Sequence, residues 1–202
     1  MATATDLEIF STAPPPPPAR PRVLLIGSAL ASGSAAMVVL ALVAQYARLR
    51  SDVISGGNTW LPEEANAQLT PGNMGMVTLV MSMVTVAWIV HALRHDDRTH
   101  ALLAFGVTLL LGAAFINVTV FGWQQLGLGA AGSTQALLIY TITGLVVAMV
   151  GAGMLFLAVM AFRALGGQLT GRSAEGVVAA VLFWYVTVAV YAVVWYAITI
   201  TK

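Results

Sequence analysis

The three histidines are the residues of this chain best suited to chemistry, and they lie close together. His91, His95 and His100 are its only imidazoles, and Asp96 and Asp97 stand between the last two. Such side chains can bind a transition metal, and a histidine can also bind haem. Either site needs further protein ligands, and no other histidine occurs in the chain. We therefore interpret His91 as an interfacial residue at headgroup level, and the other four as a short solvated loop.

Other kinds of chemistry lack the residues that they need. The chain has no cysteine, which excludes disulfides, thiolate catalysis and cysteine-ligated metals. No phosphate-binding loop, Ser-His-Asp set or HExxH motif occurs. Glu63 and Glu64 could contact a basic partner, but a solvated loop beside Trp60 is the simpler interpretation. With a net charge of +1, the chain has no basic field for nucleic acid. The sequence therefore predicts no catalytic residue, no metal ligand and no bound cofactor.

Five long apolar segments must position these side chains. The hydrophobic fraction is 59% and the mean hydropathy is +0.88, which is typical of a polytopic membrane protein. Each segment exceeds the roughly 20 residues that cross a bilayer, and each is continuously apolar rather than alternating. We expect an all-α bundle of five tilted transmembrane helices within residues 21–202, after a disordered Pro-rich tail at 1–20. The expected helices are about 23–46, 71–93, 101–123, 134–162 and 176–200.

The apolar segments contain hardly a charge. Asp, Glu, Lys and Arg make up 8% of the chain, against about a quarter in soluble domains. A membrane protein that moves protons, ions or electrons normally keeps ionisable groups at bilayer depth. This chain is therefore predicted to be a structural or accessory membrane subunit.

Basic residues in the connecting segments predict the orientation. With the N-terminus inside, six arginines face the cytoplasm, while two arginines and Lys202 lie outside. The positive-inside rule then favours an N-in, C-out topology. The six are Arg20, Arg22, Arg94, Arg98, Arg163 and Arg172.

Small and aromatic residues indicate where helices pack. Gly33 and Gly144 lie four residues from an alanine on the same helix, a spacing that permits close approach of helix backbones. Trp184 is one of several aromatic residues in the last segment, which suit packing or an interface belt better than a cofactor site.

From its first helix onward, the chain resembles cytochrome c oxidase subunit III of the haem–copper oxidases. It is similar to the short bacterial form, which has five helices and lacks the first two of the seven-helix form. The resemblance rests on landmarks in the family's order, at 31–33, 44–46, 60–62, 88–93, 111–115, 132–133, 143–144, 174–180 and 183–188.

The chain departs from the family at its polar positions. Gly33 stands where the family has a buried glutamate in its first helix, and Val146 and Met149 replace paired histidines. Further family polar residues are replaced by Thr119, Gly122, Val178, Tyr185 and Val188. A buried polar network can be lost as a unit, whereas the loss of one member would leave the others unpaired. We therefore expect packing, lipid binding and assembly to persist, and we doubt any role in supporting proton uptake.

The resemblance implies a function and partners. It implies a non-catalytic subunit of a respiratory terminal oxidase or supercomplex in the bacterial inner membrane, packed beside the catalytic subunit I, which holds haem and copper. It also implies phospholipid between tilted helices, where Arg163 and Arg172 could pair with lipid phosphates or simply be solvated. The alternatives are an accessory protein of a nitric oxide reductase, or a small transporter or channel component.

Overall fold

The computed structural model describes residues 22–60, 69–127, 133–168 and 175–200, and within them it contains helices and no strand. Five helices are long and apolar enough to cross a membrane, which confirms the predicted fold class. They are α2 (Val23–Ser55), α3 (Leu69–Arg94), α4 (Arg98–Leu126), α5 (Thr134–Leu165) and α6 (Glu175–Trp195), and a π-helical turn, η1 (Tyr196–Ile200), continues α6.

Helix α2 extends beyond the end expected from its apolar residues. The sequence placed that end near residue 46, whereas α2 continues to Ser55. Its 33 residues correspond to about 50 Å, longer than a hydrocarbon core of about 30 Å. Arg48, Arg50 and Asp52 lie in the added turns. These charges thus end the apolar segment without ending the helix, because arginine is a good helix former.

Short polar segments begin and end the other helices. Ser133 is the N-cap of α5, and its hydroxyl accepts a hydrogen bond from the backbone N–H of Ala136 at 3.2 Å. Helix α4 ends at Gly127, whose φ of 67° is the left-handed conformation that glycine adopts most easily. Only residues 95–97 separate α3 from α4, so these two helices form a tight antiparallel hairpin.

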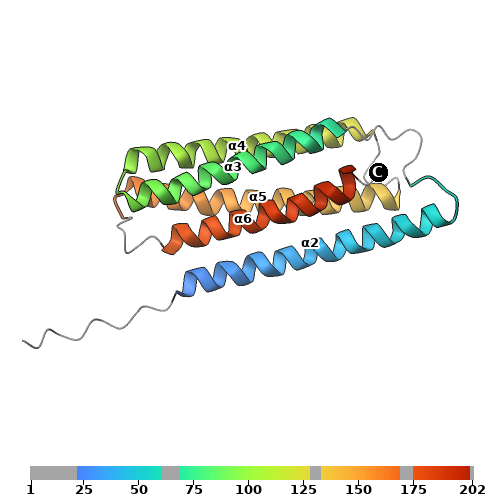
Figure 1. Ribbon diagram of the computed structural model, residues 1–202, viewed down its shortest axis with the longest axis horizontal. Helices are drawn as coiled ribbons and strands as arrows, with labels where there is room; N and C mark the ends of the chain where they lie inside the picture. The colour runs from blue at the N-terminus through green and yellow to red at the C-terminus, as the bar shows by residue number, and fades with distance from the viewer. Residues whose placement is uncertain (1–21, 61–68, 128–132, 169–174, 201–202) are drawn as a thin grey trace, which may run out of the picture.

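Helix α6 lies at the centre of the bundle. It packs against α2, α3 and α5, and Figure 1 shows it between α2 and the α3–α4 hairpin. In the most apolar part of α6, 56% of the residues are buried inside the protein, compared with 17% in α2. Helix α2 packs mostly on α6 and less on α5, so much of its surface is left uncovered.

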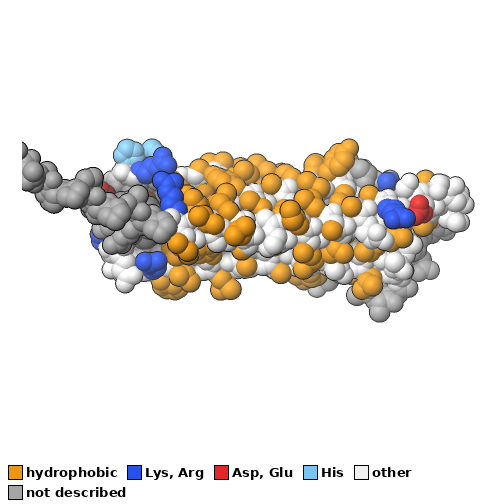
Figure 2. All heavy atoms as spheres, turned by 90° about the horizontal axis from the view of Figure 1, so that it is seen from below, with side chains coloured by type: hydrophobic (Ala, Val, Ile, Leu, Met, Phe, Trp, Pro, Cys, Tyr) orange, Lys and Arg blue, Asp and Glu red, His pale blue; other side chains and the backbone are white. Residues whose placement is uncertain are grey.

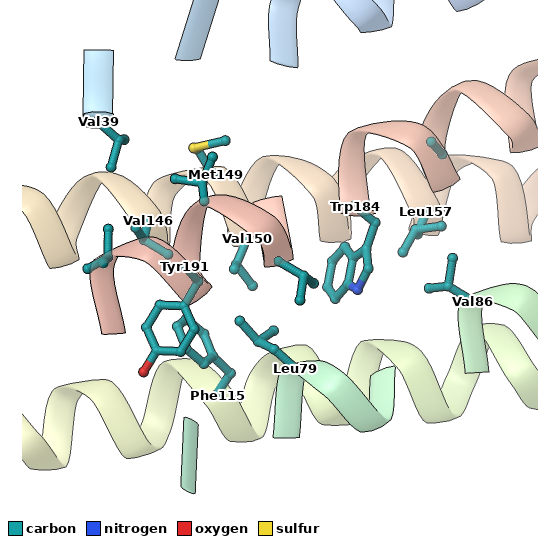
Figure 3. Packing of buried hydrophobic residues seen from close by; sticks show 14 of the residues in the cluster. Val39, Leu79, Val86, Phe115, Val146, Met149, Val150, Leu157, Trp184 and Tyr191 are labelled. Carbon is teal, nitrogen blue, oxygen red and sulfur yellow. The ribbon is translucent and has the colours of Figure 1, made fainter. Parts of the chain in front are cut away.

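The core is a continuous cluster of aliphatic and aromatic side chains. Trp184, Phe115, Leu79 and Val150 are fully buried in it and come from four different helices (Figure 3). The outside is also apolar: Figure 2 shows hydrophobic side chains across the middle of the molecule and basic side chains gathered at its two ends. This distribution is what a bilayer requires of a membrane-spanning bundle.

Because successive helices run in opposite directions, each connecting loop lies at one of the two ends of the bundle. Arg22, Arg94, Arg98 and Arg163 lie at the end where α2 begins, which we call the arginine end. Trp60 and the last residues of α6 lie at the opposite end. The histidines belong to the arginine end.

Candidate functional site

The loose packing of α2 creates an apolar groove of about 360 Å³ near the arginine end. Its walls include Val23, Leu24, Gly27 and Ala31 of α2, with Phe156 of α5 and Phe183 of α6. A groove lined in this way favours a hydrocarbon chain over a polar ligand.

Two polar contacts hold α2 beside α6 along this groove. The buried hydroxyl of Ser28 donates to the carbonyl oxygen of Ala179 at 2.7 Å. At the end of the groove, a carboxylate oxygen of Glu175 accepts from the backbone N–H of Leu25 at 3.3 Å. Because the N–H of Leu25 is in the first turn of α2, it has no partner within its own helix. These contacts fix the first part of α2 and leave the groove apolar.

Of the two arginines expected to contact lipid phosphate, Arg163 lies within the described residues. Arg163 is exposed in the last turn of α5, at the same end of the bundle as the groove. Arg172 lies outside the described residues, as do Glu63 and Glu64. The placement of Arg163 is compatible with a headgroup contact, which remains a proposal.

Trp184 occupies the middle of the bundle. Its side chain is fully buried, and its indole N–H donates to the hydroxyl of Ser82 on α3 at 2.9 Å. The ring lies against two glycines, since a Cβ at Gly153 of α5 would be 2.9 Å from it and one at Gly112 of α4 would be 3.1 Å from it. Trp184 thus joins α6 to the three helices α3, α4 and α5.

The spacing of Gly33 and Gly144 suggested close contacts between helices, but both glycines face open space in the structure. A Cβ built on either residue meets no atom within 4 Å. Neither glycine therefore allows two helices of this chain to approach closely. A contact with another subunit or with lipid at these positions remains a prediction. The close approaches occur instead at glycines that no small-residue spacing marked, such as Gly75, Gly112 and Gly153.

Hydrogen bonds from aromatic side chains stabilise the end of the bundle that lies opposite the arginine end. Trp60 donates to the hydroxyl of Tyr46 at 3.0 Å, and the two rings meet edge to face. Tyr191 donates to the carbonyl oxygen of Gly72 at 3.2 Å, and Trp195 donates to the side-chain oxygen of Asn73 at 2.9 Å. Sequence reasoning identified the aromatic enrichment of α6, but it had no signal for these partners because they lie more than a hundred residues away.

A smaller cavity of about 110 Å³ opens at that same end, between α3, α4, α5 and α6. Three of its polar side chains already have partners: Thr119 bonds to Phe115 of its own helix, Thr143 accepts from Trp123, and Tyr191 bonds as above. Among the residues that the structure describes, Tyr191 is the one ionisable side chain in the wall of this cavity.

Three of the positions at which the resemblance implies polar side chains lie in the core. Val146, Met149 and Val188 are buried within the hydrophobic cluster, and Figure 3 shows Val146 and Met149 among its side chains. Tyr185 is partly buried, and its hydroxyl donates to the carbonyl oxygen of Met83 at 3.4 Å. Val178 is 38% exposed. Val146, Met149 and Val188 therefore take part in apolar packing.

The histidines and aspartates at the arginine end separate into two pairs. The rings of His91 and His95 lie against each other in a tilted arrangement, with a centroid distance of 4.6 Å. Asp97 is the N-cap of α4: one carboxylate oxygen accepts from the backbone N–H of His100 at 3.1 Å, and the other lies 2.6 Å from Nδ1 of the same residue. The backbone hydrogen bond, followed by the ring contact, lowers the pKa of Asp97. In the part of the chain that the structure describes, no three such side chains converge well enough to enclose a metal ion.

Comparison with protein families gives a match over the helical part of the chain. The family model described as cytochrome c oxidase subunit III matches residues 23–201. The match begins at the first residue of α2 and includes all five membrane-spanning helices.

Proposed function

The chain belongs to the cytochrome c oxidase subunit III family, and from this premise we propose that it is a non-catalytic subunit of a haem–copper terminal oxidase, packed beside the catalytic subunit. The observation that carries the proposal is the family match together with a bundle that has an apolar core and an apolar outer surface. Haem and copper belong to the partner subunit. Within the described residues, no group of three or more histidine, aspartate or glutamate side chains is placed to hold a metal ion.

Assembly would use the apolar exterior of the bundle. Large hydrophobic side chains such as Met37, Leu110 and Leu155 are more than 70% exposed, and they can contact either lipid or a neighbouring subunit. Helix association in a bilayer depends on packing of such surfaces, because lipid supplies no hydrophobic drive between helices.

Co-purification tests this assignment directly. The full chain, carrying a small C-terminal tag, is extracted from its native membrane in mild detergent and captured. We expect haem-bearing oxidase subunits to be retained with it, detected by their absorbance and by mass spectrometry. Capture of a nitric oxide reductase would keep the family and change the complex. A lone, haem-free oligomer would contradict the proposal and favour a transporter or channel component.

Lipid binding is the second part of the proposal. The groove between α2 and the pair α5–α6 has an apolar lining suited to an acyl chain, and Arg163 at the same end could pair with the phosphate of that lipid. A lipid held there would fill the space that the loose packing of α2 leaves open.

Filling the groove tests the lipid proposal. Gly27 lines the groove, and a Cβ built on it meets no atom within 4 Å, so Gly27→Phe introduces a large side chain at the groove wall. Gly106→Phe is the matched control, because Gly106 is also open but lies on α4, away from the groove. We expect fewer tightly bound lipids per chain in native mass spectra of Gly27→Phe only. An equal lipid content in both variants would contradict this assignment.

A further inference from the structure

The histidine pair at the end of α3 has a geometry that neither the fold nor the proposed function explains. His91 lies in the last turn of α3, and His95 follows one helical turn later, just after the helix ends. Their rings are 4.6 Å apart, inclined at 57°, and both side chains are exposed. Sequence reasoning had grouped His95 with the loop residues and had separated it from His91.

The distance between the two rings matches the distance expected for two imidazoles that bind the same metal ion. Two imidazoles that bind one ion in adjacent positions, with metal–nitrogen bonds of about 2.0 Å, bring their ring centres to about 4.5–5 Å. The rings of His91 and His95 already have this separation. Little rearrangement of the backbone would be needed for both to bind the same ion.

The backbone around the pair is held in place by hydrogen bonds. The N–H groups of His95 and Asp97 both donate to the carbonyl oxygen of Ala92, at 3.2 and 3.0 Å, and that of Asp96 donates to Leu93. Asp96 has a φ of 54°, which turns the chain from α3 into α4. His95 is therefore attached to a closed turn and not to a freely moving loop.

Space for an ion and its water ligands adjoins the pair. A hollow of about 250 Å³ is lined by His91 and His95 together with Trp88, Asp97 and His100. Among the described residues, no three of these side chains are grouped so that they could hold one ion, so the direct protein ligands reduce to the two imidazoles of His91 and His95. Water would complete the coordination, and the carboxylate of Asp97 would add a negative charge nearby.

We propose that His91 and His95 form an exchangeable two-histidine binding site for a divalent transition metal ion at the arginine end of the bundle. Imidazole nitrogen favours Cu²⁺, Ni²⁺ and Zn²⁺ over Mg²⁺ and Ca²⁺, and Cu²⁺ should bind most tightly. The site differs from an embedded cofactor site, because it has only two protein ligands and lies on the exposed surface. It is independent of the oxidase assignment, since it rests on this chain alone.

Titration of the purified full chain with Cu²⁺ alone tests the proposal. The chain is kept in detergent and carries no histidine tag, and binding is followed by calorimetry and by electron paramagnetic resonance. We expect one Cu²⁺ per chain, with splitting from two equivalent nitrogens. His91→Gln and His95→Gln should each weaken binding at least about tenfold, since either one removes half of the chelate.

His100→Gln is the matched control, because it removes a neighbouring exposed imidazole that is paired with Asp97. It should leave Cu²⁺ binding unchanged. Equal loss in His100→Gln, or unchanged binding when both His91 and His95 are replaced, would overturn the proposal. The nitrogen splitting of the wild-type chain gives an answer that does not depend on any variant folding, since a signal without two nitrogen ligands would also exclude the site.

Discussion

At the scale of single residues, the centre of this protein is organised around one side chain. Trp184 is fully buried, bonds to Ser82, and fits against the bare backbones of Gly112 and Gly153. An indole buried in an apolar bundle needs a partner for its N–H, and Ser82 supplies it. The two glycines are required because their missing side chains make the space that the ring fills.

Two of the glycines of α5, Gly153 and Gly144, give a matched test of this packing. Gly153→Ala would push a methyl group to 2.9 Å from the Trp184 ring, a rigid group inside a packed core. We expect a loss of stability of about 1–3 kcal/mol, as is usual for overpacking. Gly144→Ala meets open space on the same helix and should be neutral or stabilise by up to about 1 kcal/mol. Thermal unfolding in detergent measures both, and equal effects would show that the Trp184 contact does not matter.

At the scale of elements, two helices have contrasting roles. Helix α6 is covered by neighbours and carries the long-range hydrogen bonds of Trp184, Tyr191 and Trp195. Helix α2 is the least buried and is held beside α6 by the contacts of Ser28 and Leu25. The bundle therefore consists of a tight four-helix part and one helix more loosely attached.

Removing the Ser28 hydroxyl should weaken the attachment of α2 by a small amount. Interhelical hydrogen bonds in membranes contribute about 0.6 kcal/mol on average, so we expect Ser28→Ala to destabilise the chain by about that much. Ser34→Ala is the control on the same helix, because Ser34 is exposed and bonds only to Ala31 of α2. Unfolding free energies in mixed micelles measure the difference. A loss above about 2 kcal/mol for Ser28→Ala would mean that this contact controls the position of α2.

The start of α4 should depend on pH through Asp97. Its pKa is lowered from the ordinary value of 3.8, first by the backbone N–H of His100 and then by the His100 ring. A carboxyl with a lowered folded pKa adds stability that is present above the unfolded pKa and is lost as the pH falls through the folded one. We expect wild type to exceed Asp97→Asn in melting temperature at neutral pH. The difference should disappear as the pH falls through the lowered pKa of Asp97. A difference that stays constant with pH would contradict the role of the charge.

At the scale of the whole molecule, five helices place the two ends of the helical domain at opposite ends of the bundle. Helix α2 begins and helix α6 ends on different sides, as Figure 1 shows. Arg22, Arg94, Arg98 and Arg163 lie at the first of these ends, and Arg48 and Arg50 lie at the other. This asymmetry is the basis for predicting which end faces the cytoplasm.

Reporter fusions test the predicted N-in, C-out topology. A phosphatase fused after Lys202 should be active outside the cell membrane, and a fluorescent reporter that folds only in the cytoplasm should stay dark there. The same reporters joined before Arg22 should give the reverse pattern. A cytoplasmic C-terminus would show that the arginine end faces outward and that the charge bias has been misread.

The sequence by itself determined the number, type and approximate position of the membrane helices, and the resemblance in its landmarks identified the family. Both are local properties: in a bilayer each helix satisfies its own backbone hydrogen bonds, so about 20 apolar residues specify a span wherever they occur. Residues such as Trp60 and the segment 88–93 could therefore be recognised without knowledge of their neighbours.

Only the tertiary structure decided which faces of the helices meet. Lipid and protein core are both apolar, so a residue such as Leu155 on the outside cannot be distinguished by type from Leu157 inside. Small-residue spacing consequently pointed to Gly33 and Gly144, which lie in open space, instead of Gly112 and Gly153, which contact Trp184. The pairing of His91 with His95 depends on the residue at which α3 ends and on the hydrogen-bonded turn that follows it. The apolar pattern of the sequence does not specify that residue.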